Sequence, residues 1–218
     1  REALERLCIT LLDECHTTLA NCTNILIETA IILDSGDDTI LAQQTTLRYL
    51  ANIYPELEEV IKTTVYNWMS SLPRIMQVSD DDSRVTAVHN LSKGIGLLQS
   101  LGVESGTLED SITASLKDSM VAHVQSSPLE TNPTTNLQLL EGPAPESSTG
   151  KPDFEQVLLA RQSQKELRGE VLGLLDKLGS VAQKAAIAEN LMESVRESSG
   201  ADQLAAMWLC YELIKASN

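Results

Sequence analysis

Three cysteines near the start of the chain have a spacing that suggests chemistry. Cys8, Cys15 and Cys22 recur every seven residues, so on one continuous helix they would share a face and invite comparison with a metal site. A helix rises ~1.5 Å per residue, which separates neighbouring sulfurs by ~10 Å, whereas each sulfur on a shared zinc ion lies ~2.3 Å from the metal. They therefore cannot share an ion. We interpret them, with the distant Cys210, as small buried apolar residues in a reducing compartment.

The histidines give no sign of catalysis or metal binding. His16, His89 and His123 fall in three separate predicted helices, and none has a Cys or Glu at ligand spacing. The chain also has no Gly-x-Ser-x-Gly motif, no phosphate loop and no dinucleotide fingerprint. We therefore predict that the protein is not an enzyme and binds no metal or cofactor.

Five residues are candidates for protein binding. The acidic run Asp80, Asp81 and Asp82 lacks the spaced oxygens of a calcium loop, and it can either engage a basic partner or cap a helix and stay solvated. We favour the capping interpretation. Trp68 and Trp208 are candidate interface anchors, although both fall on inward-facing stripes, which favours packing in the core.

Charge and composition bound the classes of partner. The chain has 218 residues, with 31 acidic and 16 basic side chains and a formal charge of −15, which repels nucleic acid and anionic membrane surfaces. No apolar run approaches the ~18 residues needed to cross a bilayer, and no signal peptide is recognisable. We expect a cytoplasmic protein, with nuclear localisation also open. Because Arg1 already lies inside a helical pattern, we expect a segment of a longer polypeptide.

Apolar residues recur at helical spacing almost throughout, which predicts an all-α fold. One stripe runs in phase from Leu4 to Leu33, and its periodicity leaves open whether a break near Thr17 divides it into two helices. The last predicted helix carries Leu204, Met207, Trp208, Tyr211 and Ile214 inward. After the first segment, one predicted helix runs from a cap at residues 37–39 to about residue 54, one runs from Pro55 through Met76, and one follows a cap in the run 80–83 and continues through Leu101. Further helices are predicted at about residues 107–125, 154–178, 181–197 and 202–216.

Prolines and glycines refine this outline. Pro55 is expected in the first turn of its helix. Pro73 lies deep inside the same helix and removes a backbone hydrogen bond, so the helix should bend there without ending. The glycine pairs Gly94 with Gly96 and Gly169 with Gly173 are interpreted as close helix crossings.

The chain divides into three parts. Residues 1–126 and 153–218 are predicted to form HEAT-like antiparallel helix pairs of one α-solenoid. Between them, residues 127–152 hold five of the seven prolines and are predicted to be a flexible linker that proteases cleave rapidly.

Two stretches resemble known families. "LPRIMQVSDDDSRVTAV" resembles the HEAT repeat, in which a proline-containing helix leads through an aspartate corner to a second helix. A longer stretch, "YPELEEVIKTTVYNWMSSLPRIMQVSDDDSRVTAVHNLSKGIGLLQSLG", with "ENLMESV" and "LAAMWLCYELIKAS", is similar to the TELO-two-interacting protein one family. The family's Trp-x-x-x-Leu-Pro-Arg-Leu/Ile-Met pattern is matched by Trp68, Leu72, Pro73, Arg74, Ile75 and Met76.

This resemblance implies a scaffold subunit of the TTT co-chaperone complex. Such a subunit binds the other two TTT subunits and, with heat-shock protein ninety and the RuvB-like ATPases, supports maturation of the phosphatidylinositol-3-kinase-related kinases, such as mTOR and ATM. It thereby serves mTOR signalling, the DNA damage response and telomere maintenance. The alternative is another HEAT or armadillo adaptor, a transport receptor or phosphatase scaffold that binds basic peptides on an acidic concave face. An all-helical enzyme is a disfavoured third class.

Overall fold

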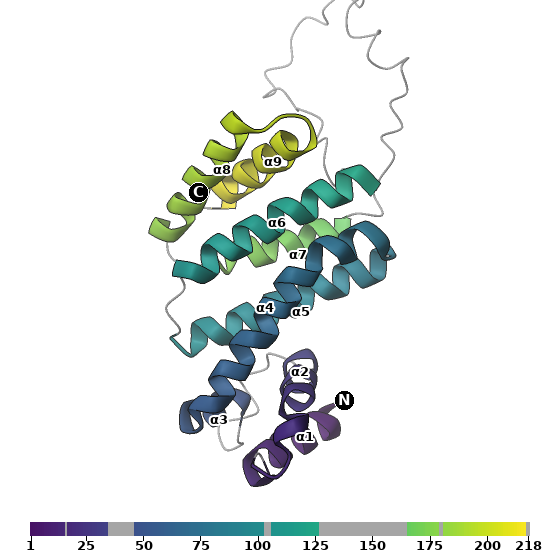
Figure 1. Cartoon of the computed structure of the whole chain (residues 1–218), viewed down its shortest axis with the longest axis vertical. Helices are drawn as coiled ribbons and strands as arrows, with labels where there is room; N and C mark the ends of the chain where they lie inside the picture. The colour runs from purple at the N-terminus through teal and green to yellow at the C-terminus, as the bar shows by residue number, and fades with distance from the viewer. Residues whose placement is uncertain (16, 35–45, 103–105, 127–164, 179–180, 217–218) are drawn as a thin grey trace, which may run out of the picture.

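The computed structural model describes residues 1–15, 17–34, 46–102, 106–126, 165–178 and 181–216. Within these ranges the chain forms helices and no strand, so the prediction of an all-α fold is confirmed (Figure 1). No helix among the described residues is both long enough and apolar enough to span a membrane. The helices are α1 (Glu2–Cys15), the short 3-10 helix η1 (Ala20–Cys22), α2 (Thr23–Leu33), α3 (Leu47–Ile53), α4 (Pro55–Val78), α5 (Asp81–Ser100), α6 (Gly106–Ser126), α7 (Lys165–Asp176), α8 (Val181–Glu197) and α9 (Ala201–Ala216).

The N-terminal segment is two helices packed against each other. The chain leaves α1 after Cys15 and enters α2 at Thr23, so the open question of a break near Thr17 is settled in favour of two helices. The expectation of one stripe in phase from Leu4 to Leu33 is wrong, because Leu4 is 48% exposed and Cys22 is also exposed. The break resets the helical phase, so residues on either side of it no longer face the same way.

The next helix, α3, is shorter than predicted. Thr46 has extended backbone angles, and its hydroxyl accepts a hydrogen bond from the backbone N–H of Tyr49 at 3.2 Å, which caps a helix beginning at Leu47. The helix predicted to run to about residue 54 is therefore interrupted at Thr46 and ends close to the predicted residue, at Ile53. The cap expected at residues 37–39 lies outside the described residues.

The prediction of Pro55 in the first turn of α4 and that of a helix that does not end at Pro73 are confirmed, and the bend at Pro73 stays a prediction. Pro55 occupies the first turn, and the helix continues through Pro73 to Val78. An apolar stripe of α4 is buried, and each such side chain contributes roughly 1.5–3 kcal/mol by leaving water. Its fully buried members are Leu57, Ile61, Val65, Met69, Leu72 and Met76.

Helices from successive parts of the chain pack side by side. The α4–α5 pair lies against α2 at one end, while α4 contacts α6 and α5 contacts α7. Beyond them, α9 contacts α6, α7 and α8. Figure 1 shows α1 and α2 at one end of the long axis and α8 and α9 at the other. The predicted helix 154–178 is described only from Lys165 onward, and residues 127–152 lie outside the described part.

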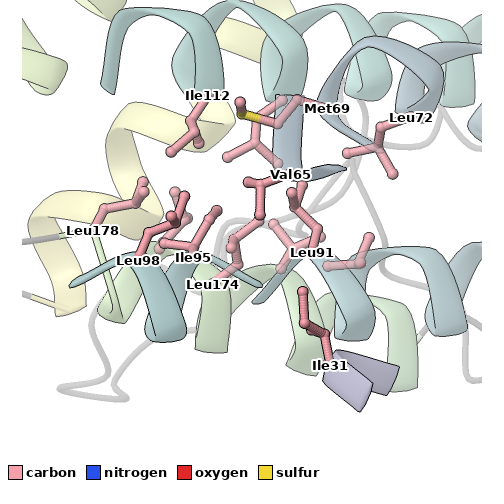
Figure 2. Packing of buried hydrophobic residues seen from close by; sticks show 14 of the residues in the cluster. Ile31, Val65, Met69, Leu72, Leu91, Ile95, Leu98, Ile112, Leu174 and Leu178 are labelled. Carbon is pink, nitrogen blue, oxygen red and sulfur yellow. The ribbon is translucent and has the colours of Figure 1, made fainter. Parts of the chain in front are cut away.

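One hydrophobic core runs through this arrangement. Figure 2 shows side chains from α2, α4, α5, α6 and α7 meeting in a single cluster, with Val65 and Met69 of α4 facing Leu91 and Ile95 of α5. The same cluster extends to buried leucines of α8 and α9. Leu, Ile, Val, Met and Ala make up almost all of it.

The inward face of α9 differs from the prediction. Met207, Tyr211 and Ile214 are 53%, 55% and 52% exposed, whereas Trp208 is buried as expected. The buried face is formed instead by Ala205, Ala206, Leu209, Cys210 and Leu213. Apolar residues surround almost the whole of α9, so periodicity alone could not select the face that meets α6 and α7.

Only one of the four singled-out glycines lies at a close helix crossing. A Cβ added to Gly94 would lie 2.7 Å from Cγ2 of Val65 on the neighbouring helix, so α4 and α5 approach closely there. A Cβ at Gly96, Gly169 or Gly173 would meet nothing within 4 Å. The prediction is confirmed for Gly94 and wrong for the other three.

Candidate protein-binding surface

The acidic run lies at the corner between α4 and α5. Helix α4 ends at Val78, and Asp80 occupies the N-cap position of α5. Asp81 and Asp82 fall in the first turn of α5. Negative charge is stabilising at this end, where unpaired backbone N–H groups make the helix dipole positive. A hydrogen bond with the side chain of Ser83 lowers the pKa of Asp80, so its carboxylate stays ionised.

All three aspartates of this acidic corner face solvent. Asp81 Oδ1 accepts a hydrogen bond from Nη1 of Arg84 at 3.0 Å, a contact within one turn of α5. Such a pair at the surface contributes ~0.5 kcal/mol or less. The side chain of Asp80 makes no capping hydrogen bond, so the prediction of a side-chain cap is wrong. The aspartates act on the helix start through their negative charge and present an acidic surface to solvent.

Charges at the acidic corner affect the pKa of a buried histidine. His123, in the last turn of α6, is 2% exposed, and burial lowers its pKa. The charge of Arg84 lowers that pKa further, whereas Asp81 raises it. The start of α5 and the end of α6 are thus electrostatically coupled.

The other two histidines lie elsewhere in the chain. Nδ1 of His89 lies 3.0 Å from Oε2 of Glu170, linking α5 to α7, and His16 is outside the described residues. Among the residues that the structure describes, no group of three or more His, Cys, Asp or Glu side chains is arranged to hold a metal ion.

Trp68 packs between three helices. Its ring lies beside Gly94 of α5, where a Cβ would meet Cζ3 of the indole at 3.4 Å. Its Nε1 donates a hydrogen bond to Oε1 of Glu28 at 3.2 Å, which joins α4 to α2. Trp68 is partly buried by these contacts, so packing accounts for its position on the inward stripe.

Trp208 lies deeper than Trp68. It is 7% exposed and belongs to the core cluster of α9. Its buried Nε1 has no hydrogen-bond acceptor among the described residues, which costs roughly 1–3 kcal/mol. Of the five candidate residues, the three aspartates are therefore the ones displayed on the surface.

The four cysteines are free thiols in different environments. Cys8 and Cys210 are buried, and burial raises the pKa of each thiol, which disfavours the reactive thiolate. Cys15 is partly exposed and Cys22 is exposed. The interpretation of all four as buried residues is confirmed for Cys8 and Cys210 and wrong for Cys22.

Two long-range polar contacts had no signal in the sequence. Nη2 of Arg168 donates to Oε1 of Glu212 at 2.6 Å, and Glu212 is only 2% exposed, so an ion pair joins α7 to α9 inside the protein. Nζ of Lys93 donates to the backbone oxygens of Ile32 at 2.9 Å and Asp34 at 2.5 Å, which closes the end of α2 against α5. Burial lowers the pKa of Lys93.

The interior offers little room for a ligand at the contact between α6, α7, α8 and α9. An apolar gap lined by Leu116, Leu175, Leu191 and Leu209, among others, has no space for a water molecule. Its lining carries almost no polar surface, so it has no groups to orient a substrate.

The comparisons with known proteins leave this chain without a match. No protein-family model matches it, and neither the search of curated proteins nor that of solved structures finds a similar protein.

Proposed function

We propose that this chain is a non-enzymatic segment of an α-solenoid scaffold built from HEAT-like helix pairs. The observation that carries the proposal is the α4–α5 pair, with Pro73 inside its first helix and the acidic corner at its turn. Beside this pair, α6 contacts α4 and α7 contacts α5. In an α-solenoid, stacked helix pairs present long exposed ridges suited to holding other proteins.

The specific scaffold that we propose is the subunit of the TTT co-chaperone complex to which the sequence is similar. In this role the chain would hold the other two TTT subunits and present phosphatidylinositol-3-kinase-related kinases to heat-shock protein ninety. The matched residues have clear places in the hairpin, since Leu72 and Met76 are buried, Trp68 bonds to Glu28, and Arg74 is exposed. The apolar part of the motif builds the pair, and the acidic corner is left for binding.

Electrostatics supports a basic partner surface at the acidic corner. Asp80 and Asp82 are exposed, and neither is held in a salt bridge among the described residues. The net charge of −15 adds a long-range attraction for basic proteins, which speeds their encounter with the chain.

The same observation supports a second candidate function. An adaptor of the HEAT or armadillo class, such as a transport receptor or a phosphatase scaffold, would also use an acidic surface to bind basic segments. The two proposals differ in the partners recovered with the chain, because the first requires TTT subunits and the second requires cargo or phosphatase subunits.

Quantitative affinity purification of the tagged chain from cells tests the proposal. We expect recovery of the other two TTT subunits and of PI3K-related kinases. A variant carrying Asp80→Asn and Asp82→Asn should recover less of them, because it removes two exposed charges while leaving the Asp81–Arg84 pair intact. The charge-matched control, Glu189→Gln with Glu193→Gln on the exposed side of α8, should recover as much as the wild type. Recovery of transport cargo or phosphatase subunits in place of TTT subunits would contradict the first proposal.

A further inference from the structure

The outer face of α9 is an apolar surface that nothing in the chain's described part covers. Leu204, Met207, Tyr211 and Ile214 are separated by three, four and three residues, the spacing of a seam between two helices. Leu204 is partly exposed and the other three are more than half exposed. We call these four residues the α9 stripe. Their span of ten residues corresponds to a helical contact ~15 Å long.

The neighbouring helix extends this surface. The side chain of Gln203 bonds to the carbonyl of Val195, and Cys210 approaches the carbonyl of Ala188, which sets α8 and α9 antiparallel. In this register Met192 of α8 lies at the level of Met207. Met192 is 43% exposed and, at 100° per residue, projects from the outer side of α8 next to α9.

We propose that the α9 stripe binds an amphipathic α-helix of a partner protein. This role adds detail to the proposed scaffold function and rests on that function only in taking the partner to be a protein. The packing inside the molecule indicates a helix. The inner side of α4 lies against α2 and α6, and α6 in turn lies between α4 and α9. Helices therefore cover both sides of each interior helix of the stack, and α9 is apolar enough to be an interior helix itself.

Charge selects the partner further. Lys215 borders the α9 stripe, is exposed, and holds its Nζ 5.9 Å from the centre of the Tyr211 ring. A carboxylate on the flank of the incoming helix would pair with this cation.

The test uses the full chain and a synthetic probe. The probe is a fluorescein-labelled amphipathic helical peptide of about 18 residues, with Leu and Ile at the seam spacing and Glu along one flank. Its fluorescence anisotropy should rise on titration with the wild-type chain. Met207→Glu and Tyr211→Glu should each weaken binding at least tenfold. Val78→Glu is the matched control, since Val78 is 75% exposed at the end of α4, and this variant should bind as the wild type does.

A second peptide with Lys in place of the flanking Glu tests the charge argument. The wild-type chain should prefer the Glu-flanked peptide, and Lys215→Glu should reverse that preference. Sedimentation velocity of the chain alone should show a monomer at every concentration. The inference would be overturned by absence of peptide binding, by equal binding to the Met207→Glu and Val78→Glu variants, or by self-association that Met207→Glu abolishes. Each result leaves the recovery of TTT subunits, which tests the scaffold proposal, unaffected.

Discussion

The hydroxyl of Ser115 on α6 donates a hydrogen bond of 2.5 Å to the backbone carbonyl of Met69 on α4. In an unbroken helix this carbonyl would accept from the backbone N–H of residue 73, but Pro73 has no N–H to donate. The helix nevertheless continues past the proline to Val78. A side chain from the adjacent helix therefore satisfies the acceptor that the proline leaves free, and it joins α4 to α6 at that point.

This relationship predicts a coupling between the two positions. Ser115→Ala should lower the free energy of unfolding by about 1–2 kcal/mol, because it leaves the Met69 carbonyl without a partner. In a Pro73→Ala background, the new N–H of residue 73 can bond to Met69, and the serine substitution should then cost about 0.5 kcal/mol or less. Urea unfolding of the four proteins measures the cycle. Ser70→Ala serves as the control, because Ser70 bonds within its own helix, to Tyr66. Equal costs in both backgrounds would disprove the coupling.

Two glycines on α5 form a matched pair for testing helix packing. Gly94→Ala should destabilise the protein by about 1–3 kcal/mol, because its Cβ would collide with Val65 and press on Trp68. Gly96→Ala places a methyl group in open space and should stabilise the helix by up to about 1 kcal/mol. Thermal and urea unfolding both report the difference. Stabilisation of the chain by both substitutions would show that α4 and α5 are not in close contact.

The buried ion pair between α7 and α9 should matter more than an exposed one. Arg168→Ala leaves the carboxylate of Glu212, 2% exposed, without its partner and should cost about 3–5 kcal/mol. The exposed pair of Glu2 with Arg6 provides the control, and Arg6→Ala should cost less than about 0.5 kcal/mol. Chemical denaturation gives both values. Similar small costs at the two sites would mean that Glu212 is hydrated in solution.

Acid should destabilise the protein through His123. Burial lowers the pKa of this histidine in the folded chain, so the unfolded chain binds a proton more readily. The stabilising contribution of the neutral ring is complete above pH ~6.5 and is lost as the pH falls through the lower folded-state pKa. Urea midpoints measured from about pH 7.5 to pH 5 should decline less steeply for His123→Gln than for the wild type. An equal decline in the two proteins would contradict the assignment.

Local signals in the sequence predicted much of this fold. Pro55 marked the start of α4. The apolar spacing is preserved on both sides of Pro73, which predicted that the helix continues past this proline. The acidic run from Asp80 to Asp82 likewise marked the corner at which α5 starts. These features act within one or two turns of a helix, so they can be interpreted without knowing what packs nearby.

The errors came from properties that depend on distant contacts. On α9 nearly every residue is apolar or small, so the buried face was decided by the contacts with α6 and α7. The seven-residue spacing of Cys8, Cys15 and Cys22 is compatible with one continuous helical stripe. The chain turns between α1 and α2, so the stripe is interrupted. The sequence did not indicate the hydrogen bonds of Ser115 and Arg168, because their partners Met69 and Glu212 lie 46 and 44 residues away in the chain.

Direct binding of the purified chain to a purified complex of the other two TTT subunits tests the central claim most simply. Isothermal titration calorimetry should detect a stable interaction with the wild type. The Asp80→Asn, Asp82→Asn variant should bind more weakly, and the Glu189→Gln, Glu193→Gln control should bind as the wild type does. Circular dichroism would establish that each protein is helical. A helical wild-type chain that fails to bind the two subunits would contradict the proposal that it is a TTT scaffold segment.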